Sequence, residues 1–159
     1  MSSQHRPNEA PNGAPNGETL EEYLAGLLAA VEKGMGQVLS PYGLIALEFK
    51  LLKFCLRNEE CTATQLAEVL PTDPARISRL VNGLVEMGFL SRRRLTTDRR
   101  IVMLSLTEAG RERILESDRA IQDFFDILEQ GISPEARGAF ISIAVTMTAN
   151  YDAMRQREE

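Results

Sequence analysis

Apolar residues recur at two different periods along the chain, and the change of period divides it into elements. From Glu18 or Thr19 onward, leucines and valines return every three or four positions until Pro41 and Gly43, which predicts one long helix. The same period predicts five further helices, over residues 46–57, from Thr62 or Thr64 to Leu70, and over 73–87, 108–130 and 134–151. The chain is therefore predicted to be mainly α-helical.

One helix start is especially well marked. Asp73 is a favoured N-cap, and Pro74 suits the first helical position because its missing N–H would have no partner there. Gly88 is predicted to end this helix. Between Phe89 and Leu106 the apolar residues alternate, which predicts two strands joined by a turn at residues 96–99.

The first 17 residues differ in composition from the rest. Residues 1–17 are rich in proline, glycine and asparagine and hold almost nothing apolar to bury, which predicts a disordered arm. Residues 18–159 are predicted to form a single domain, since a chain of 159 residues with 43% hydrophobic content can build one core. No apolar run approaches the roughly 20 residues that a membrane span needs, so a soluble, cytoplasmic protein without membrane contact is expected.

Charge is distributed unevenly along the sequence. The formal net charge is −5, but the segment from Arg76 to Arg100 holds seven arginines against Glu86 and Asp98. That segment carries +5 and the remainder −10, so a basic patch lies in an acidic body. Such a patch indicates a polyanionic partner, of which double-stranded DNA is the leading candidate.

The helix that begins at Asp73 has the face required for reading a DNA groove. Its apolar side opposes a small, polar and basic side, on which arginine can bind guanine, Asn82 can pair with adenine and Ser78 can reach phosphate. The preceding short helix, with Thr64 near its start, would support it as in a helix-turn-helix. The predicted DNA-binding residues of these two helices are Thr64, Ala75, Arg76, Ser78, Arg79 and Asn82.

The arginine-rich hairpin strengthens this interpretation. Five arginines, at 92–94, 99 and 100, concentrate positive charge where a β-ribbon can contact the DNA backbone or a narrow minor groove. Arg94, Arg99 and Arg100 are the predicted DNA contacts. Asp98 is predicted to orient Arg100 by a charge-assisted hydrogen bond, because phosphate would repel a carboxylate.

Three stretches of sequence carry a family resemblance. They run Cys61-Thr-Ala-Thr-Gln-Leu-Ala-Glu-Val-Leu, then Ile77-Ser-Arg-Leu-Val-Asn-Gly-Leu-Val-Glu-Met-Gly-Phe-Leu, then Thr97-Asp-Arg-Arg-Ile-Val-Met-Leu-Ser-Leu-Thr-Glu-Ala-Gly110. With Tyr42-Gly-Leu and Leu47-Glu-Phe-Lys-Leu-Leu52 upstream, they resemble the MarR family of winged helix-turn-helix transcription regulators. The resemblance implies that Ser78 and Arg79 lie on the recognition helix, and that Asp98 and Arg100 are the acid and the minor-groove arginine of the wing.

The resemblance also implies an architecture and a mode of action. A winged-helix DNA-binding lobe would span about 44–107, and residues 18–43 and 108–159 would supply dimerisation helices. A homodimer would then repress transcription from a pseudo-palindromic operator. A small aromatic or phenolic effector is expected between the dimer helices and the lobe, with Met35, Tyr42, Phe49 and Arg57 as candidate contacts; no other cofactor is expected.

Other classes of function fit the residues less well. His5 is the one histidine of the chain, so neither a Ser-His or Cys-His nucleophile nor a typical metal site can be assembled, and no catalytic or metal-binding residue is predicted. A winged-helix module that binds protein is a stronger rival, but its wing would not need five arginines. Cys55 and Cys61 suggest a redox input as an alternative to an effector, although Cys55 falls on an apolar face where an inert thiol is common.

Overall fold

The computed structural model of the protein describes residues 19–70, 72–96 and 101–157. The predicted arm of residues 1–17 and the predicted wing residues Asp98, Arg99 and Arg100 lie outside these ranges. The elements in chain order are α1 (Leu20–Leu39), the 3₁₀ helix η2 (Ser40–Tyr42), α2 (Ala46–Arg57), β1 (Cys61–Thr62), α3 (Ala63–Val69), α4 (Pro74–Glu86), β2 (Leu90–Arg94), β3 (Val102–Leu106), α5 (Glu108–Leu128) and α6 (Pro134–Arg155). All six predicted α-helices are confirmed.

Side-chain caps fix where several helices begin. Thr19 accepts a hydrogen bond from the Glu22 backbone N–H, and the Glu22 carboxylate accepts one from the Thr19 N–H at 2.7 Å, so two otherwise unpaired groups satisfy each other. Thr62 and Gln65 form the same arrangement at the start of α3. These local signals explain why the helix starts were readable from the sequence.

The sheet has three strands, whereas the alternation of residues 89–106 predicted only two. Its order is β1-β3-β2 with antiparallel pairing throughout, and β2 and β3 pair from Leu90 with Leu106 to Arg94 with Val102. The additional strand, β1, pairs Cys61 with Leu104. A strand of two residues is too short to show a period of two, so the sequence pattern did not predict β1.

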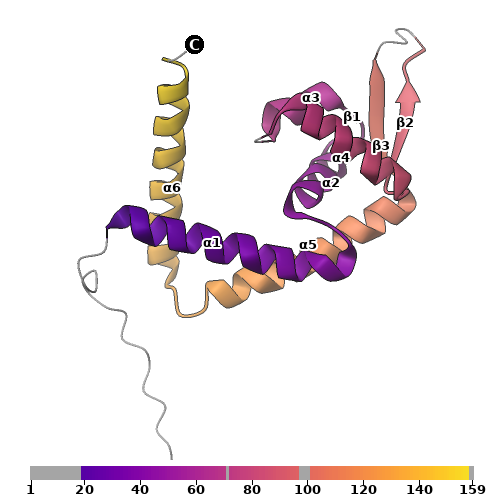
Figure 1. Cartoon of the computed structure of the whole chain (residues 1–159). Coiled ribbons are helices and arrows are strands. Elements are labelled where there is room, and N and C mark those ends of the chain that lie inside the picture. Colours follow the sequence, from indigo (N-terminus) through magenta and orange to yellow (C-terminus); the bar gives the residue numbers. More distant parts are fainter. Residues whose placement is uncertain (1–18, 71, 97–100, 158–159) are drawn as a thin grey trace, which may run out of the picture.

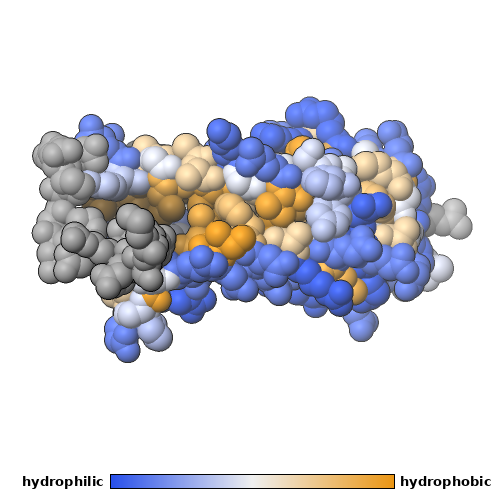
Figure 2. Space-filling model, turned by 90° about the horizontal axis from the view of Figure 1, so that it is seen from below, coloured by the Kyte–Doolittle hydropathy of each residue, from blue (hydrophilic) through white to orange (hydrophobic). Residues whose placement is uncertain are grey.

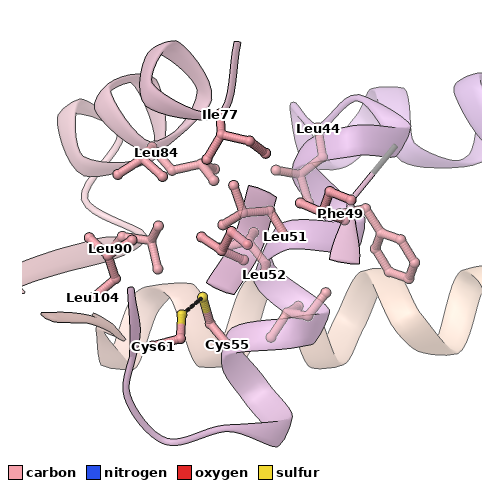
Figure 3. Packing of buried hydrophobic residues seen from close by; sticks show 14 of the residues in the cluster. Leu44, Phe49, Leu51, Leu52, Cys55, Cys61, Ile77, Leu84, Leu90 and Leu104 are labelled. Carbon is pink, nitrogen blue, oxygen red and sulfur yellow. Dashed lines mark hydrogen bonds between the residues drawn. The ribbon is translucent and has the colours of Figure 1, made fainter. Parts of the chain in front are cut away.

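One continuous apolar core lies between this sheet and the helices α2, α3 and α4 (Figure 3). Leu51 and Leu52 of α2 are completely buried, as are Leu66 of α3 and Leu84 of α4. The β3 residue Leu104 closes the core from the sheet side, with an exposed fraction of 1%. Burial on this scale makes the lobe formed by α2, α3, α4 and the sheet a rigid platform for the side chains on its surface.

The base of the β2–β3 hairpin is fastened to the start of α5. Thr107 caps α5 by accepting from the Gly110 N–H at 3.0 Å, and its hydroxyl donates to the Gly88 carbonyl at 2.6 Å. Gly110 approaches the backbone so closely that an added Cβ would lie 2.0 Å from the Phe89 carbonyl oxygen. The Leu-Thr-Glu-Ala-Gly stretch is therefore the joint between the hairpin and α5.

The helices α1 and α6 bury much less. Figure 1 shows α6 standing apart from the lobe, with α1 and α5 running between the two. No residue of α6 is buried, and Phe140, Ile143 and Tyr151 are each more than half exposed. Apolar side chains also gather on the face seen in Figure 2, and the exposed large apolar residues of α1 are Leu20, Tyr23, Leu27 and Leu28. None of the helices within the described ranges is long and apolar enough to cross a membrane.

Candidate DNA-binding surface

The helix α4 is held by its buried side and leaves a polar side exposed. The Asp73 carboxylate caps it by accepting from the Arg76 N–H at 2.8 Å. This hydrogen bond, with a smaller contribution from the positive charge of Arg79, lowers the pKa of Asp73. Ile77, Val81 and Leu84 are buried against the core. The exposed residues on the other side are Ala75, Arg76, Ser78, Arg79 and Asn82.

The helix α3 supports α4 from within the lobe. Leu66 anchors α3 in the core, and the two helices pack against each other. Thr64 is exposed near the start of α3. Gly88, with φ of 75°, provides the left-handed turn that leads from α4 into β2. The arrangement is that of a helix-turn-helix followed directly by a hairpin.

The strand β2 carries three consecutive arginines next to α4. Leu90 is buried at its start, and the four residues from Ser91 to Arg94 are exposed. Arg92 donates a hydrogen bond to the side-chain oxygen of Asn82, which joins β2 directly to α4. The Asn82 oxygen keeps a second lone pair, so Asn82 still offers both an acceptor and its NH₂ donor to a base.

A glutamate partly neutralises the second arginine. One guanidinium nitrogen of Arg93 contacts both carboxylate oxygens of Glu60 at 2.8 Å. The pair is exposed, so its stabilising contribution is small. Its effect on the surface charge is larger, because it sets a negative group beside the arginine row.

A concave surface of about 380 Å³ lies between α4 and the hairpin. Ser78 and Asn82 of α4, Arg92 and Arg94 of β2, and Ala63 of α3 contribute to its lining, and Val81, Val102 and Leu104 complete it. The surface thus combines positive charge, hydrogen-bonding groups and a hollow shape.

Seven of the predicted DNA-binding residues belong to the described ranges, and all seven are exposed on α3, α4 and β2. They are Thr64, Ala75, Arg76, Ser78, Arg79, Asn82 and Arg94. Asp98, Arg99 and Arg100 lie outside those ranges, so their predicted roles stay predictions. The site prediction did not include Arg92 or Glu60. Arg92 was available from the run of three arginines, whereas Glu60 is 33 residues from Arg93 and gave no local signal.

A second hollow, of about 540 Å³, lies between α1, α2 and α5. Met35 and Phe49, both predicted effector contacts, line it together with Phe125. Its charged lining residues have both signs and are Lys50, Lys53, Asp126, Glu129 and Arg137. Lys53 pairs with Asp118 and lies over the Phe49 ring, 5.6 Å from its centroid. The other two predicted contacts are not among its lining residues: Tyr42 is half-buried in η2, and Arg57 is exposed at the end of α2.

Comparison with known proteins agrees with this architecture. The family model described as MarR family matches residues 45–102. The HTH-type transcriptional regulator YdgJ of Bacillus subtilis (strain 168) is 30% identical over 110 residues, which cover 69% of this chain and 67% of YdgJ. The chain belongs to the MarR family, whose members are transcriptional regulators and not enzymes.

Solved structures of the same fold are more distant in sequence. The transcriptional repressor CouR, bound to a 23-mer DNA duplex, superimposes with a TM-score of 0.76 at 22% identity, over 82% of this chain and 92% of CouR. BpsR of Bordetella bronchiseptica superimposes with a TM-score of 0.74 at 20% identity, over 86% of this chain and 98% of BpsR. These likenesses confirm the predicted winged-helix fold.

Proposed function

We propose that the protein is a sequence-specific repressor that binds double-stranded DNA as a homodimer. The observation that carries this proposal is the continuous exposed surface of α4 and β2, where Arg76 and Arg79 lie beside the arginines of the hairpin. A helix with such a face fits the major groove, while the hairpin reaches the adjacent backbone or minor groove. CouR, a repressor of the same fold, is bound to a DNA duplex in its solved structure.

A dimer accounts for the exposed apolar residues outside the lobe. Phe140, Ile143 and Tyr151 of α6 and Leu20 and Leu28 of α1 are all more than half exposed in one protomer. Exposed apolar residues in such numbers favour association, and a twofold axis would present two copies of α4 to one duplex. The matching DNA site is a pseudo-palindrome with half-sites about one helical turn apart.

A small aromatic or phenolic effector is proposed for the hollow between α1, α2 and α5. Met35, Phe49 and Phe125 offer an apolar and aromatic lining, and Lys50 can attract an anionic substituent. DNA binding by BpsR is regulated by an aromatic acid, 6-hydroxynicotinic acid. An effector that prefers a different spacing of the two lobes would lower DNA affinity by shifting the population of conformations.

The DNA-binding proposal is tested by selecting duplexes from a random library and measuring their affinity across a salt series by fluorescence anisotropy. Affinity should fall steeply as salt rises, because arginine–phosphate contacts release counterions. Arg79→Ala should weaken binding about 5- to 100-fold and change which sequences are selected. Arg155→Ala, in the last turn of α6 and outside the surface formed by α3, α4 and β2, is the control and should bind like wild type.

Two results would contradict the proposal that the protein binds DNA. One is the failure of the library to yield any enriched duplex, which would favour a protein-binding winged helix instead. The other is an affinity that does not depend on salt, since a surface built on arginines cannot bind phosphates without that dependence.

A further inference from the structure

The two cysteines lie side by side in the core of the lobe. Cys55 is in the last turn of α2 and Cys61 is the first residue of β1, and their sulfurs are 3.3 Å apart (Figure 3). Both are free thiols with exposed fractions of 1%. Packing alone requires only two small apolar side chains here, and would not require the sulfurs to face each other.

The contact makes the two thiols chemically unequal. The hydrogen-bonded contact with Cys61, together with burial, raises the pKa of Cys55 above its usual range. The same hydrogen bond lowers the pKa of Cys61, because it stabilises the thiolate. A lowered pKa favours the thiolate, so we assign Cys61 as the attacking thiol of the pair.

We propose that Cys55 and Cys61 are a reversible disulfide site, oxidised by hydroperoxides, and that the disulfide weakens DNA binding by the adjoining α3, α4 and β2. The second part rests on the proposed DNA-binding function, while the first part does not. The position of each cysteine at the end of an element, rather than in its middle, makes the site deformable.

Closing the disulfide needs only a small movement. An S–S bond is about 2.0 Å long, so the two sulfurs must approach by about 1.3 Å. β1 has two residues and lies at the edge of the sheet, and the preceding residues 57–60 are exposed. A short edge strand opens locally at low cost, which admits a small peroxide to Cys61 without unfolding the lobe.

The reaction balances with a hydroperoxide as the oxidant. The Cys61 thiolate attacks one peroxide oxygen, forming an S–O bond while the O–O bond breaks, and an alcohol or water leaves after taking up a proton. Cys55 then attacks the Cys61 sulfur, the S–O bond breaks, and the departing hydroxide takes the Cys55 proton as water. The two thiols lose two electrons in total, and a dithiol reductant restores them by exchange.

The position of β1 connects the disulfide to the DNA-binding surface. Cys61 pairs with Leu104 of β3, and its neighbour Thr62 is the N-cap of α3. Drawing Cys61 toward α2 must therefore displace the start of α3, pull on β3, or break the β1–β3 pairing. Each of these changes moves the supporting helix α3 or the hairpin relative to α4. Because α4 and the hairpin must contact DNA at the same time, such a movement weakens DNA binding.

The experiment treats the full-length reduced protein with hydrogen peroxide and measures its mass and free thiols under denaturing conditions. We expect the mass of the single chain to fall by two hydrogens, both thiols to become unreactive toward N-ethylmaleimide, and dithiothreitol to reverse both changes. Thiols that stay reactive, or a mass that rises through sulfinic acid, would overturn the site. This readout uses the wild-type chain and needs no variant.

The effect on DNA is measured by anisotropy on the same samples, with a duplex obtained by selection. Oxidation should weaken binding by about fivefold or more, reversibly, and Cys55→Ala and Cys61→Ala should each remove the response to peroxide. A disulfide that forms without changing affinity would overturn the regulatory part. A reduced protein that binds no DNA would contradict the proposed function, while the mass measurement still decides whether the disulfide site exists.

Discussion

At the scale of single residues, two similar ion pairs differ in the surface to which they belong. Glu60–Arg93 lies beside the arginine row of β2, and Glu129–Arg137 joins the end of α5 to the start of α6. In both, the arginine side chain is 56% exposed and the glutamate side chain 41% exposed. They therefore provide a matched comparison of the same chemistry on and off the proposed DNA-binding surface.

Glu60→Gln should strengthen DNA binding by about two- to fivefold, because it removes a negative charge near the phosphates and releases Arg93 to contact them. The dependence of affinity on salt should steepen by about one phosphate contact. Glu129→Gln is the control and should leave both quantities at the wild-type values. Equal effects of the two substitutions would show that Arg93 does not face DNA.

Replacing each of two glycines by alanine should change the free energy of unfolding in opposite directions. An added methyl at Gly110 would meet the Phe89 backbone, which cannot give way, whereas nothing lies within 4 Å of a Cβ at Gly83. Gly110→Ala should therefore lower the free energy of unfolding by about 2 kcal/mol. Gly83→Ala, inside α4, should raise it by about 0.5–1 kcal/mol, since alanine restricts the unfolded chain. Urea unfolding followed by circular dichroism measures both, and stabilisation by Gly110→Ala would contradict the close approach.

Most residues of the candidate surface could be predicted from sequence, because their signal is local. The spacing of α4 predicted an apolar side opposite a polar side that carries Arg79. The burial of Ile77 and Leu84 and the exposure of Arg79 confirm this division. Partners distant in sequence could not be predicted. Nothing near Arg93 indicates Glu60, and nothing near Cys55 requires its sulfur to face that of Cys61. Such contacts depend on how the elements pack, which a periodic pattern does not encode.

At the scale of elements, the start of α4 depends on a single charged side chain. Asp73 has a lowered pKa because the Arg76 N–H donates to its carboxylate. A carboxyl group whose pKa is lower in the folded state stabilises the fold above its unfolded pKa, and loses that contribution as the pH falls through its folded pKa. The ordinary value for Asp73 is 3.8, so the loss belongs below that pH.

Asp73→Asn isolates this effect, because asparagine also caps helices but does not titrate. The melting temperature of the wild type should fall more than that of Asp73→Asn between about pH 4 and about pH 2. Other carboxyl groups titrate in both proteins, so the difference between the two curves reports on Asp73. Parallel curves would mean that the carboxylate contributes no more than a neutral cap.

The elements that sequence predicted well are those with their own start and stop signals. α4 begins after Asp73–Pro74 and ends before the left-handed Gly88, and both ends were predicted within about one residue. The strand β1 has no such signal, since its two residues are defined only by pairing with β3. Its existence follows from the sheet rather than from its own sequence.

At the scale of the whole molecule, a single protomer leaves the apolar side chains of α6 exposed. The lobe has a closed core, whereas α6 crosses the N-terminal half of α1, away from the lobe, and has no buried residue (Figure 1). A helix of 22 residues with apolar side chains on one stripe needs a surface against which to pack. If a second protomer provides that surface, a charge placed on the stripe affects assembly while leaving the individual protomer intact.

Ile143→Glu should convert the dimer to a monomer in sedimentation velocity at micromolar concentration, because it would bury a carboxylate in the apolar interface. Far-ultraviolet circular dichroism should change little, since Ile143 is 55% exposed in the protomer. Affinity for a two-half-site duplex should fall by a factor of about 100 or more, as each lobe then binds alone. Ser142→Glu, on the opposite side of α6, is the control and should remain dimeric. If Ile143→Glu stays dimeric and binds DNA normally, α6 does not form the interface and the two DNA-binding surfaces are joined by another part of the chain.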